Sequence, residues 1–88
     1  MKLKEGFLLH DVGEDHMAVA TGEAGKVFNG LIRNNATGQF IFQQLQKDTT
    51  EEQLVKAMEE QFDAPQEKIA ADVHRVVEQL KKAGFLDE

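Results

Sequence analysis

The side chains best suited to chemistry in this sequence are three histidines, His10, His16 and His74. His10 and His16 flank one predicted turn, so they could approach each other on neighbouring strands. No third ligand stands at a familiar spacing, and the helical zinc pattern HExxH is missing. We therefore read the histidines as hairpin and surface residues, and we expect neither a metal ion nor an organic cofactor.

Nucleophilic catalysis lacks its usual side chains, since the sequence has no Cys and no Ser. Their absence excludes a thiolate nucleophile, a disulfide, a Ser-His-Asp triad and a serine-linked acyl or peptidyl carrier. The carboxylate pairs Glu51-Glu52 and Glu59-Glu60 fall on solvated faces of amphipathic helices. The segment GEAGK at 22–26 is too short for a phosphate loop and precedes a predicted strand. We therefore expect no active site.

The composition is that of one small globular domain, with 88 residues, 41% hydrophobic residues and 30% charged residues. The net charge is −6, and residues 47–88 contribute −5 of it, whereas residues 1–46 are nearly neutral. An acidic surface repels phosphate, so a nucleic-acid partner is not expected. No signal peptide and no apolar run of about 20 residues is present, so we expect a cytosolic protein with no membrane partner.

The first third of the chain predicts three short strands, over residues 7–12, 16–21 and 27–32. The first is an apolar run, Met17 and Val19 alternate in the second, and β-branched and aromatic residues favour the third. The clusters GED and GEAG between them are typical of turns. Three such strands form an antiparallel meander, which needs helices over one face.

The rest of the chain predicts three helices, over residues 36–46, 50–62 and 65–83. Asn35 is a suitable N-cap for the first helix, and Gly84 is a suitable left-handed residue after the last. The second helix opens on a capping box, either Thr50 with Gln53 or the pair one residue earlier. The third helix has an apolar stripe at Ile69, Val73, Val76, Leu80 and Ala83.

This order of elements predicts an α+β fold, a three-stranded antiparallel sheet followed by three helices. Its outline is a winged helix-turn-helix domain that spans residues 1–88.

Several segments in this order resemble the PqqD-like family, named after pyrroloquinoline quinone biosynthesis. The resemblance covers residues 5–86 and rests on VFNGLI at 27–32, NATG at 35–38 with Ile41, Phe42 and Leu45, TTEE at 49–52, Asp72-Val73, and Leu80 with AGFL at 83–86. It implies a winged-helix chaperone that binds the leader segment of a ribosomally made precursor peptide. It also implies delivery of that peptide to a modifying enzyme, often a radical S-adenosylmethionine (SAM) enzyme.

The resemblance further implies that the peptide adds as a strand to the third strand and lies against the third helix. The strand side of this expected site is Val27, Phe28, Asn29, Gly30, Leu31 and Ile32. At about 100° per residue, one flank of the third helix is formed by Ala70, His74, Val77 and Lys81, and we expect this flank to face the peptide. The alternative is that Val77 only widens the core stripe.

Two other functions remain open at this point. Winged-helix domains often bind DNA, but residues 65–86 carry a net charge of only +1. A dimerisation module would use the same unprotected strand edge for pairing with a second copy.

Overall fold

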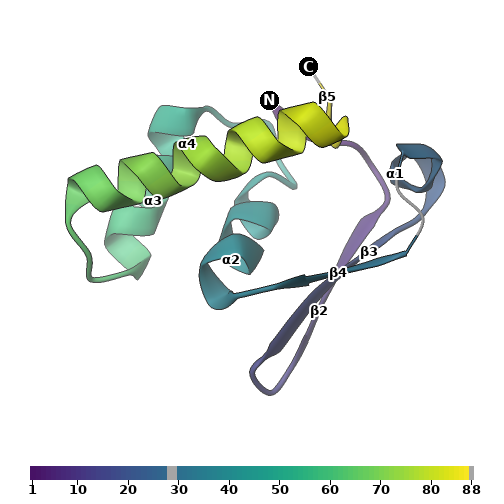
Figure 1. Ribbon diagram of the computed structural model, residues 1–88, viewed down its shortest axis with the longest axis horizontal. Helices are drawn as coiled ribbons and strands as arrows, with labels where there is room; N and C mark the ends of the chain where they lie inside the picture. The colour runs from purple at the N-terminus through teal and green to yellow at the C-terminus, as the bar shows by residue number, and fades with distance from the viewer. Residues whose placement is uncertain (28–29, 88) are drawn as a thin grey trace.

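The computed structural model describes residues 1–27 and 30–87 of the chain (Figure 1). The elements follow in the order β1 (Lys2–Leu3), β2 (Phe7–Val12), β3 (Asp15–Ala20), α1 (Gly22–Val27), β4 (Leu31–Asn34), α2 (Ala36–Gln44), α3 (Glu51–Gln61), α4 (Gln66–Ala83) and β5 (Leu86–Asp87). The expected α+β class, with a three-stranded antiparallel sheet followed by three long helices, is confirmed. Among the described residues, no helix is both long and apolar enough to span a bilayer.

The main sheet has the order β2-β3-β4, and both pairs are antiparallel. Strand β2 coincides with the prediction over 7–12, and β3 starts one residue earlier than predicted. The predicted strand over 27–32 is wrong in its bounds, because α1 extends to Val27 and the observed strand β4 occupies Leu31–Asn34. Phe28 and Asn29 of that prediction lie outside the described residues.

Tertiary contacts explain the short helix α1, which was not predicted from the sequence. Ala24 is fully buried, and its amide donates to the carbonyl oxygen of Glu5 at 3.0 Å. Two glycines in six residues lower the helix propensity of this segment. The packing of Ala24 therefore outweighs a local sequence that favours a turn.

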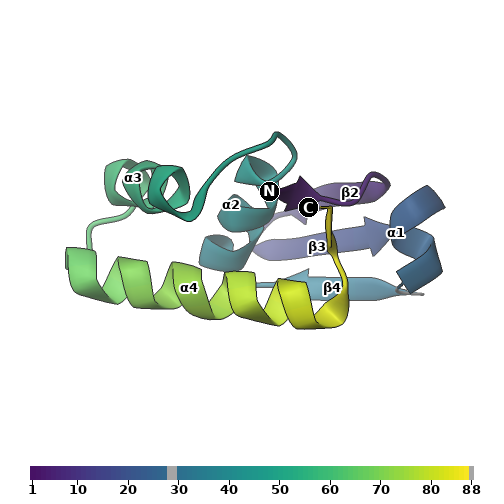
Figure 2. The same ribbon diagram turned by 90° about the horizontal axis from the view of Figure 1, so that it is seen from above.

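Helix α2 lies between the sheet and the pair formed by α3 and α4 (Figures 1 and 2). Its buried residues Ile41 and Phe42 join residues of every layer in one core. The ring of Phe7 on β2 lies edge-on to Phe42 at 5.9 Å and beside Phe85 at 5.1 Å, measured between ring centroids. These contacts hold the sheet, α2 and the segment after α4 together.

The helix ends agree with the predicted capping. Thr50 and Gln53 form the capping box of α3, and Gly84 ends α4 in the left-handed conformation with φ of 77°. The core stripe of α4 differs from the prediction at two positions, since Val77 is fully buried in place of the half-buried Val76, and Ala83 is exposed. Both valines fit a stripe of period 3.6, and the packing of α3 against α4 selects Val77.

The two ends of the described chain lie together. Strand β1 pairs with β5, with Leu3 opposite Leu86. The N-terminal ammonium group donates to Asp48 Oδ1 at 2.6 Å. This hydrogen bond and the positive charge of the ammonium group hold the pKa of the Asp48 carboxyl below its usual range.

Candidate functional site

A groove of about 580 Å³ separates β4 from the C-terminal half of α4. Figure 1 shows β4 running below this half of the helix. The apolar lining comes from four segments and comprises Ile32, Phe42, Val76, Leu80, Ala83 and Phe85. The polar lining comprises Arg33, Asn34, Asn35, Arg75 and Gln79, and Gly38 completes it. We refer to this feature as the β4–α4 groove.

The turn between β4 and α2 shapes one end of the groove. Asn35 caps α2, and its Oδ1 accepts the amide hydrogen of Gly38 at 2.7 Å. A Cβ atom added to Gly38 would lie 3.2 Å from this oxygen and 3.5 Å from the Asn34 side chain. Glycine at this position therefore permits the cap and leaves the end of the groove without a side chain.

A buried glutamine positions β4 against the hairpin. Gln39 is 2% exposed, and its Nε2 donates to the carbonyl oxygen of Met17 at 2.9 Å and to Asp11 Oδ1 at 3.3 Å. Asn34 Nδ2 donates to Gln39 Oε1 at 2.9 Å. Satisfied polar groups of this kind fix a unique arrangement of the core. Gln39 is not among the residues predicted from the sequence, although its spacing of three residues from Phe42 places both on one helix face.

The free edge of β4 presents main-chain groups of alternate residues. In an antiparallel pair, residues whose N–H and C=O groups face the partner alternate with residues whose groups face away. The Ala20 amide donates to the carbonyl oxygen of Gly30 at 3.5 Å, and the register continues with Ile32 two residues later. The main-chain groups of Leu31 and Arg33 therefore face away from β3, towards the edge that no described strand covers.

The flank of α4 that lines the groove carries Arg75, Val76 and Gln79. Arg75 is exposed and lies 3.4 Å from Asp72 on the same helix. Val76 is half-buried, so it offers an apolar surface next to these polar groups. The groove therefore combines an apolar surface with amide and guanidinium donors.

The helix flank predicted from the sequence to face the peptide does not line the β4–α4 groove. His74 Nδ1 is 3.3 Å from the Glu51 carboxylate of α3, so this flank faces α3. Val77 is fully buried, as in the alternative in which it widens the core stripe, so it offers no surface to a peptide. Ala70 and Lys81 are exposed and do not line the β4–α4 groove. Figure 2 shows α3 beside the first half of α4, whereas the groove follows the second half.

A physical signal against the predicted flank was present in the sequence. The apolar residues Leu54 and Met58 of α3 need a partner surface, and both are buried. The most apolar flank of α4 is its natural partner, which leaves the flank of Arg75 and Gln79 for the strand. On the strand side, the groove retains Ile32 from the predicted set, and Leu31 contributes to the adjacent free edge.

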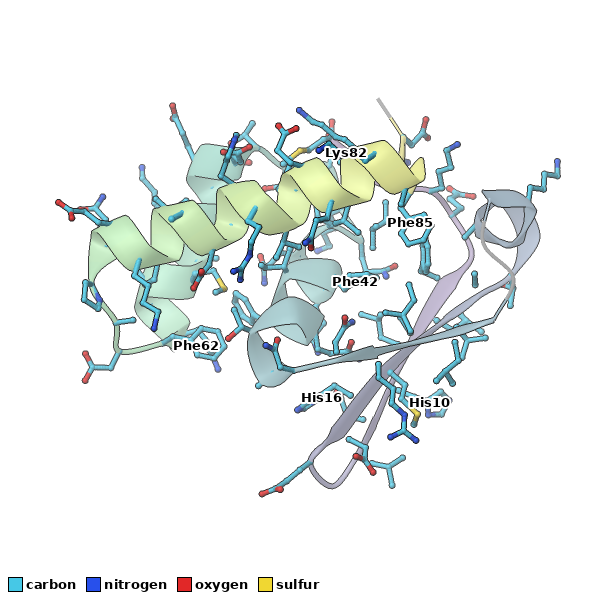
Figure 3. All side chains as sticks on the ribbon, viewed as in Figure 1. His10, His16, Phe42, Phe62, Lys82 and Phe85 are labelled. Carbon is cyan, nitrogen blue, oxygen red and sulfur yellow. The ribbon has the colours of Figure 1, made fainter. Side chains whose placement is uncertain are left out.

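The two hairpin histidines do not meet. His10 stands opposite Met17, and His16 stands opposite Asp11, so they leave the sheet on opposite faces. Figure 3 shows them on the two sides of the hairpin. His16 Nδ1 contacts Asp11 Oδ1 at 2.7 Å. Within residues 1–27 and 30–87, no three acidic or histidine side chains gather closely enough to hold a metal ion.

Comparison with solved structures finds the same fold in a protein described as TbiB1 in complex with the TbiA(beta) leader peptide. The two chains share 14% sequence identity with a TM-score of 0.73, over 99% of this chain and 95% of the other. A comparison with curated proteins finds no match.

The family model described as coenzyme PQQ synthesis protein D (PqqD) matches residues 6–86. The match contains the main sheet, α2, α3, α4 and every residue that lines the β4–α4 groove. With its sheet, its helices and its groove all inside this match, the chain belongs to the PqqD family.

Proposed function

We propose that this protein binds the leader segment of a ribosomally made precursor peptide and presents it to a modifying enzyme. The observation that carries the proposal is the β4–α4 groove, which lies between an unpaired strand edge and a half-apolar helix flank. Membership of the PqqD family supports a role in the modification of a peptide. The likeness in fold to a protein bound to a leader peptide supports the choice of ligand.

Strand addition is the binding mode that suits this edge. The outward main-chain groups of Leu31 and Arg33 offer two donors and two acceptors to an extended peptide. Main-chain hydrogen bonds would supply affinity, and alternate side chains of the peptide would supply selectivity. One set of these side chains would face the groove beside Ile32, and the other set would face the open side of the sheet.

The helix side of the proposed site is the flank of Arg75, Val76 and Gln79. It replaces the flank of His74 and Val77, because Val77 is buried and His74 contacts α3. An apolar peptide side chain would pack on Val76 and on the buried rings behind it. The Gln79 amide and the Arg75 guanidinium would bind polar groups of the peptide.

The same groove argues for a partner enzyme that does the chemistry, such as a radical SAM enzyme. Its described lining contains amide, guanidinium and apolar side chains, without a carboxylate, a histidine or a nucleophile. None of these groups exchanges a proton near neutral pH, so general acid–base catalysis has no donor or acceptor there. We infer that the protein is an accessory component and has no catalytic activity of its own.

A DNA-binding winged helix is the competing function, and charge argues against it. The chain carries a net charge of −6. On α4, Arg75 is already close to Asp72, and His74 is close to Glu51. Tight DNA binding needs several uncompensated cations along the recognition helix.

The proposal is tested by an amide chemical-shift titration of the ¹⁵N-labelled protein. The probe is a set of linear 12-residue peptides selected against the protein from a random-sequence display library. We expect the largest shifts at residues 31–35 and at 75–83. Shifts concentrated on Ala70, His74 and α3, with β4 unchanged, would contradict the proposed groove. The same titration with duplex DNA at physiological salt should leave both segments unchanged.

A further inference from the structure

The open face of the sheet carries two ordered rows of side chains that end at the free edge. The register places Leu8, Val19 and Leu31 directly opposite one another across the three strands. Two residues along, His10 stands opposite Met17, and Met17 opposite Arg33. Directly opposite residues share a face of the sheet, so each row lies on one side.

Both rows are accessible to a ligand. Leu8 and Leu31 expose 56% and 49% of their surface, which is high for leucine in a folded domain. Arg33 is exposed and makes no ion pair with any described residue, whereas Arg75 is close to Asp72. The row of Arg33 contains no carboxylate. At the free edge, one row therefore ends in the apolar Leu31, and the other ends in Arg33, whose charge no described carboxylate neutralises.

A strand added to β4 would extend both rows. Leu31 and Arg33 direct their main-chain groups outward, so an antiparallel peptide would place one residue directly opposite each of them. These two peptide residues lie two positions apart, on the open face. Cross-strand apolar pairs and opposite-charge pairs stabilise a sheet, and like charges destabilise it.

We propose that the site selects extended peptides with an acidic residue opposite Arg33 and an apolar residue opposite Leu31, two positions apart. The inference rests on the proposed peptide-binding function and adds the chemical class of peptide that the site prefers. The acidic residue comes first along the peptide if the added strand is antiparallel, and second if it is parallel. Because the whole chain is acidic, the preference arises from contact with Arg33 and not from long-range attraction.

The test is a selection of random linear 12-residue peptides on the immobilised protein and on two charge variants. Arg33→Glu reverses the charge at the edge. Lys82→Glu makes the same change in formal charge at a residue that does not line the groove, and Figure 3 shows Lys82 above the helix and away from β4. Circular dichroism confirms that both variants are folded before selection.

The wild type and Lys82→Glu should enrich peptides that carry Asp or Glu two positions from an apolar residue. Arg33→Glu should enrich Lys or Arg at the acidic position, which a merely destabilised protein would not do. For one selected peptide, changing the acidic residue to its amide should weaken binding to the wild type by roughly fivefold. The same change should weaken binding to Arg33→Glu by less than about twofold.

Two results would overturn the inference. If the wild type enriches peptides without an acidic preference, or Arg33→Glu keeps that preference, peptide binding stands and the role of Arg33 is wrong. If the wild type enriches no peptide, the proposed peptide-binding function fails together with the inference.

Discussion

Adjacent valines on α4 allow the orientation of this helix to be tested by one pair of substitutions. Val77 is fully buried against the core, whereas Val76 is half-buried and lines the β4–α4 groove. Val76→Ala and Val77→Ala remove the same atoms from the same helix. We expect Val77→Ala to reduce stability and Val76→Ala to reduce peptide binding.

The magnitudes follow from burial. Removing two methyl groups from a fully buried site costs about 1.6 kcal/mol, and the cavity left at Val77 adds about 1 kcal/mol. The higher helix propensity of alanine offsets about 0.5 kcal/mol at either position. The free energy of unfolding should therefore fall by about 2 kcal/mol for Val77→Ala. For Val76→Ala, half the burial and no closed cavity leave a loss of about 0.3 kcal/mol.

Urea unfolding followed by circular dichroism at 222 nm measures the difference. A domain of this size unfolds with a slope of about 1 kcal/mol per molar urea, so the Val77→Ala midpoint should be about 2 M lower. A total stability of roughly 4–13 kcal/mol leaves this variant folded at room temperature. Its affinity for selected peptides should be unchanged, whereas Val76→Ala should bind them about fourfold more weakly. Equal loss of stability in both variants would refute the orientation of α4.

Three further substitutions or conditions test other contacts. Leu31→Pro removes an outward-facing amide, which an edge strand tolerates. It should abolish peptide capture and leave the melting temperature close to that of Leu31→Ala. Capture that persists would contradict strand addition at this edge. Gly6 has φ of 111°, and an added Cβ would overlap a main-chain carbonyl oxygen, so Gly6→Ala should lower stability by at least about 2 kcal/mol in urea unfolding. Gly13→Ala, where φ is 61° with open space around it, should be milder. The lowered pKa of Asp48 means that its carboxylate stabilises the fold above the unfolded-state pKa of about 3.9. This contribution is lost as the pH falls through the folded-state pKa. Asp48→Asn should therefore slightly reduce the loss of stability at acid pH, as measured by unfolding at a series of pH values.

Most of the fold was accessible from the sequence because its signals are local. The capping box at Thr50, the cap at Asn35 and the glycine at 84 each mark a helix end through a contact between near neighbours. The observed bounds of α2, α3 and α4 lie within two residues of the predicted bounds for this reason. The alternation in β2 and β3 is likewise a property of a few adjacent residues.

The elements that the sequence concealed depend on contacts between distant residues. Helix α1 is stabilised by the burial of Ala24 and by its contact with Glu5. Strand β4 ends in Asn34, a polar residue that becomes acceptable on the inner face only because Gln39 pairs with it. Neither partner can be recognised before the fold is known, so the predicted third strand both began and ended too early.

The position of the site shows the same limit. An apolar period of 3.6 residues cannot decide between neighbouring valines at 76 and 77, since each fits the stripe. Which of the two valines is buried depends on where α3 packs. This in turn decides which polar residues of α4 face the strand. The sequence pointed to the strand and helix that border the β4–α4 groove, but the helix flank that it favoured contains the buried Val77 and does not line this groove.

The pairing of β1 with β5 brings the two ends of the described chain next to each other, and Figure 1 shows N and C on the side away from the turn of the β2–β3 hairpin. A domain with adjacent ends can be inserted into a surface loop of another protein through two short connections. Such an insertion would leave β4 and the second half of α4 untouched. The fold is therefore suited to insertion as an intact domain into a larger enzyme, where two connections would restrict its orientation more than one would.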